Sequence, residues 1–94
     1  MGGVITAIVM ISVETDKIPE VAEQIADLDG VSEVYSVTGD DDLVAVVRVR
    51  RHEELADVVT GRIACLAGIR TTRTMVAYQA FSKHDLESIF NVGM

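Results

Sequence analysis

The sequence is poor in the residues that several common functions require. It has one cysteine, Cys65, so no disulfide can form within the chain. Only 8 Lys and Arg stand against 15 Asp and Glu, which argues against direct nucleic-acid binding because such binders place many cations on phosphates. The apolar run at 4–13 is too short to span a bilayer and lacks the basic flank of a signal peptide. We therefore expect a cytoplasmic protein with neither a nucleic acid nor a membrane as its direct partner.

Cysteine and histidine give weak signals for catalysis or metal binding. Cys65 falls in an apolar helical pattern, which favours a small buried side chain over a catalytic thiol. His52 precedes two glutamates, but no second His or Cys follows at ligand spacing, so we interpret this segment as the charged first turn of a helix. We expect no metal and no cofactor.

The 94 residues suffice for one small domain, which we assign to 1–94. Apolar residues make up 49% of the chain, and its mean hydropathy is +0.32. A small domain has much surface for its volume, so this apolar content predicts that part of the surface is covered by a partner subunit.

The pattern of apolar residues and turn signals predicts the order βαββαβ. β-Branched runs predict the strands, while apolar residues at helical spacing predict the helices. Asp16 and Pro19 predict the start of the first helix, and Ser82 to Asp85 the start of a short C-terminal helix. The strands are expected over 4–13, 31–38, 43–49 and 69–81, and the two main helices over 18–28 and 55–66. This order is typical of the ferredoxin-like α+β fold, an antiparallel four-stranded sheet with both helices on one face.

Both faces of the predicted sheet are apolar. The face away from the helices would carry Ile8 and Met10 of the first strand and residues such as Val44 and Val46 of the third. An antiparallel sheet with one solvated face should alternate more cleanly between apolar and polar residues. We therefore expect a homodimer through this face, as in a dimeric α/β-barrel. A ligand-filled groove on a monomer is the alternative.

A glycine and three consecutive aspartates occupy the predicted turn at 39–42, between the second and third strands. A tight turn could be built from one Gly and one Asp, so the extra negative charge needs another explanation. It is either a solvated loop tip or a site for a cation or an amino group. The spaced pattern of a Ca²⁺ loop is absent, which makes metal binding the weaker hypothesis.

Two segments together resemble a known family. The residues 30–42, GVSEVYSVTGDDD, resemble the second strand and turn (roughly G-V-x-x-x-Y-x-V-T-G-D-Y-D) of the effector domain of Lrp/AsnC regulators, also called the RAM domain. Residues 68–76 are similar to that domain's last strand, and the resemblance extends from about Val4 to Phe81. It implies a non-enzymatic domain that dimerises through its sheets. In that family the dimers assemble further, often to octamers or rings, and amino-acid effectors bind between dimers near the Gly-Asp turn.

Carried over by position, the family's turn corresponds to Gly39, Asp40 and Asp42, and its strand hydroxyls to Thr72 and Thr74. The chemistry of these residues also suits an amino acid. An aspartate can accept a charge-assisted hydrogen bond from an ammonium group, while turn N–H groups and threonine hydroxyls can bind a carboxylate. The expected effector-binding residues are thus Gly39, Asp40, Asp41, Asp42, Thr72 and Thr74. Asp41 stands where the family commonly has Tyr, so an aromatic wall is lost and a charge gained.

Two functional hypotheses follow. The full-length regulators carry an N-terminal helix-turn-helix, and this sequence begins at the first effector-domain strand, so we expect a stand-alone RAM domain. Such a protein would sense amino acids or modulate a full-length Lrp-type regulator through mixed oligomers. The alternative is a small dimeric α/β-barrel enzyme, such as a monooxygenase or isomerase, for which Tyr35 and Tyr78 are the candidate residues.

Overall fold

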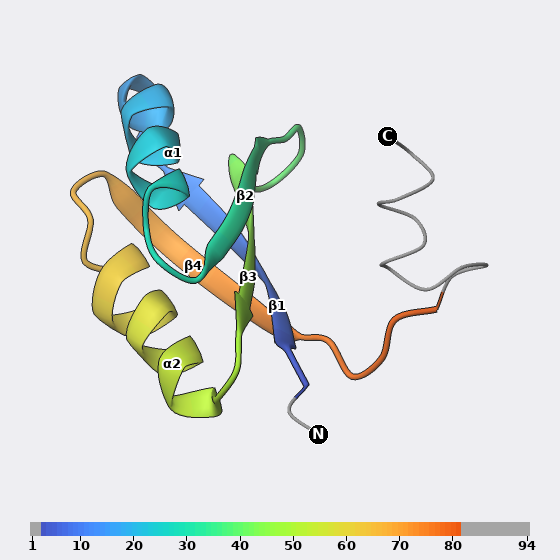
Figure 1. Cartoon of the computed structure of the whole chain (residues 1–94). Coiled ribbons are helices and arrows are strands. Elements are labelled where there is room, and N and C mark those ends of the chain that lie inside the picture. Colours follow the sequence, from blue (N-terminus) through green and yellow to red (C-terminus); the bar gives the residue numbers. More distant parts are fainter. Residues whose placement is uncertain (1–2, 82–94) are drawn as a thin grey trace, which may run out of the picture.

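A computed structural model describes residues 3–81 and has the predicted ferredoxin-like α+β fold. The strands form one antiparallel sheet in the order β2-β3-β1-β4, and both helices lie on the same face of it (Figure 1). A short 3₁₀ turn, η1, precedes α1, and a π-helical segment, η2, continues α2. The elements are β1 (Ile5–Val13), η1 (Thr15–Lys17), α1 (Ile18–Ala26), β2 (Val31–Ser36), β3 (Leu43–Val49), α2 (His52–Ala56), η2 (Asp57–Ile63) and β4 (Ile69–Val76).

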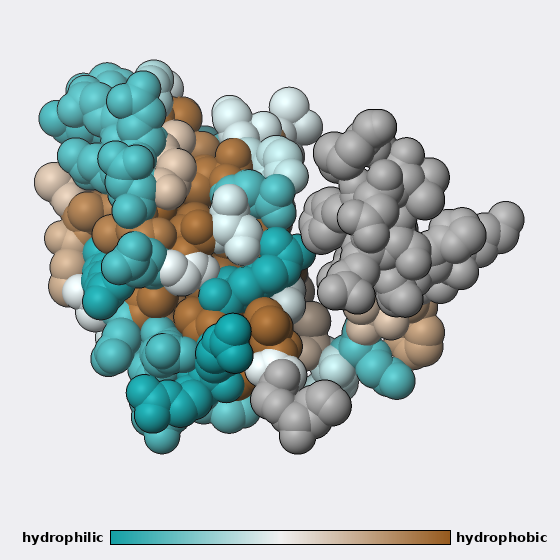
Figure 2. All heavy atoms as spheres, in the orientation of Figure 1, coloured by the Kyte–Doolittle hydropathy of each residue, from teal (hydrophilic) through white to brown (hydrophobic). Residues whose placement is uncertain are grey.

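The core lies between the sheet and the helices. Alternate residues of β1 and β3 point toward the helices and are fully buried, among them Val9, Ile11 and Leu43. Figure 2 shows hydrophilic residues over the outer surfaces of the helices and hydrophobic residues gathered between helices and strands. The helices close this core with Val21, Ile25, Leu55, Val58 and Ile63. The alternation expected from the sequence is thus confirmed on this face.

Two strands end earlier than the sequence predicts. β2 stops at Ser36 because the chain turns through Gly39 toward β3. β4 stops at Val76, and the Ala77 N–H makes a last bond to the Thr6 carbonyl (2.8 Å) near the beginning of β1. Beyond this bond the segment 77–81 leaves the edge of β1 and runs away from the sheet (Figure 1). The helix expected to start at Ser82 to Asp85 lies outside the described residues.

The first helix begins one residue later than the proposed Asp16 cap would place it. Asp16 lies within η1, and the residue that precedes α1 is Lys17, which makes no side-chain capping bond. The Lys17 N–H instead bonds to the Glu14 carbonyl (2.8 Å) in the 3₁₀ turn. The cap prediction was therefore wrong, whereas Pro19 does lie in the first helical turn.

The second helix is not a uniform α-helix. It begins at His52, whose neighbouring glutamates form the acidic first turn as expected, and becomes π-helical from Asp57 onward. The predicted apolar residues still face the core: Leu55, Val58 and Ile63 are buried, and Val59 and Leu66 pack against them. Cys65 follows two residues after the end of η2 and is exposed, not buried as predicted, and its Sγ lies 3.6 Å from the Thr60 carbonyl oxygen.

Glu54 closes the start of α2. Its carboxylate accepts hydrogen bonds from the backbone N–H groups of Arg50 (2.9 Å) and Arg51 (3.1 Å). These bonds favour the ionised form and lower the pKa of Glu54 below its ordinary value of 4.5. A depressed folded-state pKa means that the stabilisation is complete above pH 4.5 and is lost as pH falls through the folded pKa.

We therefore expect Glu54→Gln to make the melting temperature fall less steeply as the pH is lowered into the acid range. The wild type should lose melting temperature below pH 4.5 more steeply than the variant, because only the wild type has this carboxylate to protonate. Thermal unfolding followed by circular dichroism from neutral pH downward measures both. Glu53→Gln is the matched control, since Glu53 is an exposed neighbour in the same turn. An equal loss of melting temperature at acid pH in the wild type and in Glu54→Gln would contradict this account.

Candidate effector site

The Gly-Asp turn is a loop closed by backbone hydrogen bonding. The Val37 N–H donates to the Asp42 carbonyl (3.0 Å), and Gly39 between them has a φ of +115°. A Cβ built on Gly39 would meet nothing within 4 Å, so glycine is favoured there by backbone conformation and not by space. Asp40 next to it is exposed. Its carboxylate is the one in the turn that faces solvent.

Asp42 fastens the turn to the central strand. Its N–H donates to the Ile11 carbonyl (2.9 Å), and its Oδ2 accepts the Val13 N–H (2.8 Å). β1 runs past its last partner in β3, the pair Ile11 and Leu43, so the side chain of Asp42 supplies an acceptor where β3 no longer offers a carbonyl. This carboxylate therefore has a structural role in the free chain.

Asp41 is the buried polar residue of the described chain, with 7% exposure. It accepts a charge-assisted hydrogen bond from the Arg73 guanidinium and lies 3.4 Å from the Ser12 hydroxyl oxygen. A solvated loop tip is thus the wrong interpretation for this aspartate. Asp41 thus acts as a tether between the turn and the edge strand β4, and Arg73 of that strand supplies its counter-charge.

The strand register separates the two threonines from this tether. Thr72 lies opposite Ile11 and Thr74 opposite Val9, so both point toward the helix-covered face. Arg73 lies opposite Met10 and points to the open face, where it meets Asp41. Among residues 3–81, no hydrogen bond joins the Gly-Asp turn to either threonine.

Arg73 and Ser12 are the residues that the sequence reasoning missed. The structure pairs Asp41 with Arg73 and fastens Asp42 to Val13, whereas Thr72 and Thr74 point to the other face of the sheet. The available signal was the charge itself: Asp41 departs from the family pattern, and a lone arginine stands between the two threonines of the last strand.

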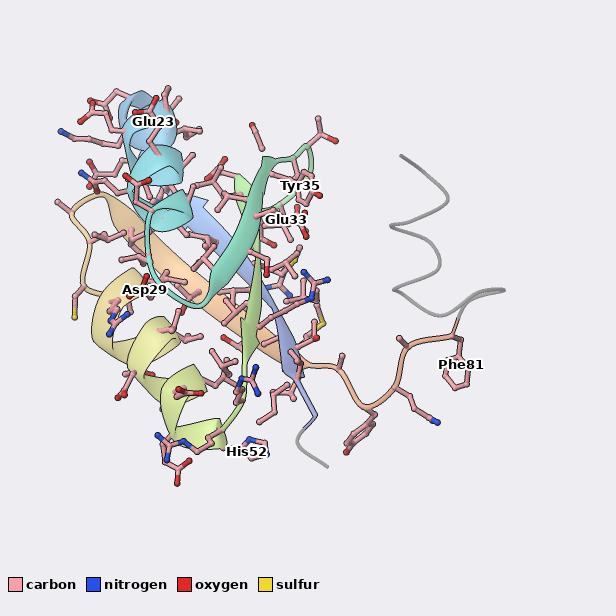
Figure 3. All side chains as sticks on the ribbon, in the orientation of Figure 1. Glu23, Asp29, Glu33, Tyr35, His52 and Phe81 are labelled. Atoms are coloured by element: carbon pink, nitrogen blue, oxygen red, sulfur yellow. The ribbon has the colours of Figure 1, made fainter. Side chains whose placement is uncertain are left out.

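The two tyrosines lie outside the core. Tyr35 is half exposed on β2, and its hydroxyl donates to Glu33 Oε2 (3.0 Å), which raises the pKa of the phenol (Figure 3). Arg48 approaches the other oxygen of Glu33 at 3.4 Å. Tyr78 is fully exposed in the segment after β4. Neither tyrosine lies between sheet and helices, where the enzyme hypothesis would need it.

Residues 3–81 lack two other features, a metal-binding cluster and a membrane-spanning helix. Residues 3–81 contain no group of three His, Cys, Asp or Glu side chains arranged to hold a metal ion. No helix within the same range has the length and apolarity needed to cross a membrane.

The tether predicts a stability effect at a largely exposed residue. Arg73→Gln removes the cation but leaves the Asp41 carboxylate buried, so we expect a loss of about 1–2 kcal/mol in the free energy of unfolding. The side chain of Arg73 is itself 66% exposed, which keeps the effect below that of a fully buried pair. Chemical denaturation measures it.

Arg70→Gln is the control for that measurement, because Arg70 is an exposed arginine on the same strand with no ion pair among residues 3–81. It should leave the free energy of unfolding nearly unchanged. Equal effects of the two substitutions would show that Asp41 does not depend on Arg73.

Comparison with known proteins matches nearly the whole chain to one family of ligand-binding domains. The family model described as the Lrp/AsnC ligand binding domain matches residues 6–86. A crystal structure from Thermus thermophilus is 47% identical, with a TM-score of 0.80 over 84% of this chain and 99% of that one. A feast or famine regulatory protein from M. tuberculosis, in complex with L-methionine, is 29% identical, with a TM-score of 0.65 over 86% of this chain and 54% of that one.

The curated relatives are regulators. An HTH-type transcriptional regulator of Pyrococcus furiosus is 38% identical over 76 residues, which are 78% of this chain and 51% of the relative. The chain spans 39% to 51% of the length of the curated regulators that it matches.

Proposed function

Since this chain belongs to the Lrp/AsnC ligand-binding domain family, we propose that it is a non-enzymatic module that binds a free amino acid and assembles into oligomers. The observation that carries the proposal is the family match over residues 6–86, which includes nearly the whole sheet, both helices and the Gly-Asp turn. The L-methionine bound to the M. tuberculosis relative supports an amino acid as the class of effector.

The chemistry of the turn favours recognition of an ammonium group by Asp40. Asp41 and Asp42 already accept hydrogen bonds from Arg73 and Val13, which leaves Asp40 as the exposed carboxylate. The backbone around Gly39 is open on the side where a Cβ would lie, so a ligand can approach it closely.

Thr72 and Thr74 are proposed to bind the effector carboxylate at a contact between copies. Within one chain they face away from Arg73 and Asp41, so a second copy is needed to bring such hydroxyls opposite the turn. The proposed site is therefore complete only in an assembly of dimers, such as an octamer or ring.

The dimer is proposed to form through the open face of the sheet. Two rows of side chains cross this face, Tyr35–Val44–Met10–Arg73 and Glu33–Val46–Ile8–Met75. Their centre is aliphatic, and the helices lie on the other side of the sheet. At about 25 cal/mol per Å² of apolar surface, burying a few hundred Å² per chain offsets much of the roughly 4–15 kcal/mol that association costs.

We further propose that the protein acts in transcriptional regulation in the cytoplasm. Its curated relatives are HTH-type regulators, and a shared ligand-binding fold allows mixed assembly with such a partner. Binding of an amino acid would then alter the state of the mixed oligomer.

The dimer is tested at the centre of the open face. Met10→Lys places a cation there, which must be desolvated in a face-to-face contact, so we expect a monomer in native mass spectrometry. Thr60→Lys is the control, since Thr60 is exposed on the helical side and should keep the wild-type assembly. An unchanged mass for Met10→Lys would rule out this interface.

Effector binding is tested by a thermal-shift screen of the common amino acids, followed by calorimetric titration of any that stabilise. Asp40→Asn should weaken binding at least about tenfold, because it removes the carboxylate proposed to pair with the ammonium group. Glu23→Gln is the control, an exposed carboxylate on α1 (Figure 3). An intact oligomer that responds to none of the amino acids would contradict the proposal.

A further inference from the structure

A groove on the helical side of the molecule has no role in the proposed effector site. It has a volume of about 350 Å³ and lies between the loop at Asp29–Gly30 and the helical segment formed by α2 and η2. Asp29 lies beside the helical segment that begins at His52 (Figure 3). We name it the α2 groove and define it by Asp29, Gly30, Arg51, Asp57, Val58 and Arg62.

The π-helical segment shapes one wall of the α2 groove. In an α-helix, residues five apart are rotated by about 140° from one another and face different ways. In η2 the bonds reach five residues back, as the Ala64 N–H bond to the Val59 carbonyl (3.0 Å) shows. This spacing brings Asp57 and Arg62 to the same wall of the groove. π-Helical turns are rare in proteins, and those that occur are often found at functional sites.

The floor of the α2 groove is held by tight packing. Gly30 has a φ of +93°, and a Cβ built on it would lie 2.9 Å from Val58 Cγ2 and 3.3 Å from Val49 Cγ1. Any side chain at position 30 would push the helical segment away from the sheet. The groove is therefore a preformed feature of the fold.

The α2 groove carries both signs of charge. Asp29 and Asp57 supply carboxylates, and Arg51 and Arg62 supply guanidinium groups. Glu54 also lines it, but its carboxylate is engaged by backbone N–H groups. No ion pair within residues 3–81 involves the other four side chains, so their charges are available to a bound molecule.

We propose that the α2 groove binds a small zwitterion, the α-amino and α-carboxylate groups of a free amino acid, independently of the Gly-Asp turn. The arginines take the carboxylate and the aspartates the ammonium group, each through charge-assisted hydrogen bonds. A polyanion would be repelled by the aspartates. Two carboxylates without a third free ligand do not make a cation site, in line with the absence of a metal-holding cluster among residues 3–81.

The test is a titration followed by backbone amide chemical shifts in ¹⁵N-labelled protein. L-Glutamine, L-glutamate and L-lysine serve as probes at millimolar concentration. At least one is expected to shift the amides of Gly30 and of Asp57 to Arg62. Butyrate and butylamine, which each carry one of the two charges, should bind there at least about tenfold more weakly.

Substitutions distinguish binding at the α2 groove from binding at the Gly-Asp turn. Asp57→Asn and Arg62→Gln should each weaken binding at the α2 groove at least about tenfold, whereas Arg70→Gln should not. Shifts confined to Gly39 through Asp42 would overturn this proposal and leave the proposed function standing. Absence of shifts in the groove with all three amino acids, or equal binding of butyrate, would overturn it as well.

Discussion

Two helices can cover only one face of a four-stranded sheet, and the rest of this molecule follows from that constraint. On the covered face, alternate residues of β1 and β3 are fully buried and form the core. On the open face the same strands present Ile8 and Met10, aliphatic residues that the chain itself leaves half exposed. Polar residues gather at the edges of this face, with Tyr35 on β2 and Arg73 on β4. The chain therefore buries apolar side chains on one face of its sheet and leaves those on the other face partly exposed.

The aspartate run divides into three separate roles. Asp42 replaces a missing strand carbonyl, Asp41 is buried against Arg73, and Asp40 faces solvent. Burial of Asp41 is tolerable because its counter-charge comes from the neighbouring edge strand. The turn is therefore held in place by its own carboxylates, which reduces the cost of ordering it when a ligand binds.

Local pattern was enough to predict the element order and the alternation in β1 and β3, because a period of two in β-branched residues has few other interpretations. The C-terminal bound of β4 was wrong because its pairing with β1 ends at Ala7 and Val76, and the apolar residues after Val76 run on without a strand partner. The pairing of Asp41 with Arg73 joins residues 32 positions apart, and no local pattern encodes it. The π-helical turn and the exposure of Cys65 were missed as well, since apolar spacing does not reveal one extra residue in a turn and a small apolar side chain can lie on either side of a helix.

The bond between Asp42 and the Val13 amide links the turn to the exchange behaviour of the central strand. While the turn is docked, this N–H is protected at a position where β3 offers it no carbonyl. Once the turn lifts away, the amide faces water and its hydrogen exchanges with solvent. The exchange rate of the Val13 amide hydrogen therefore depends on whether the turn is docked on β1. Hydrogen exchange at this single position reports whether the loop is open or closed.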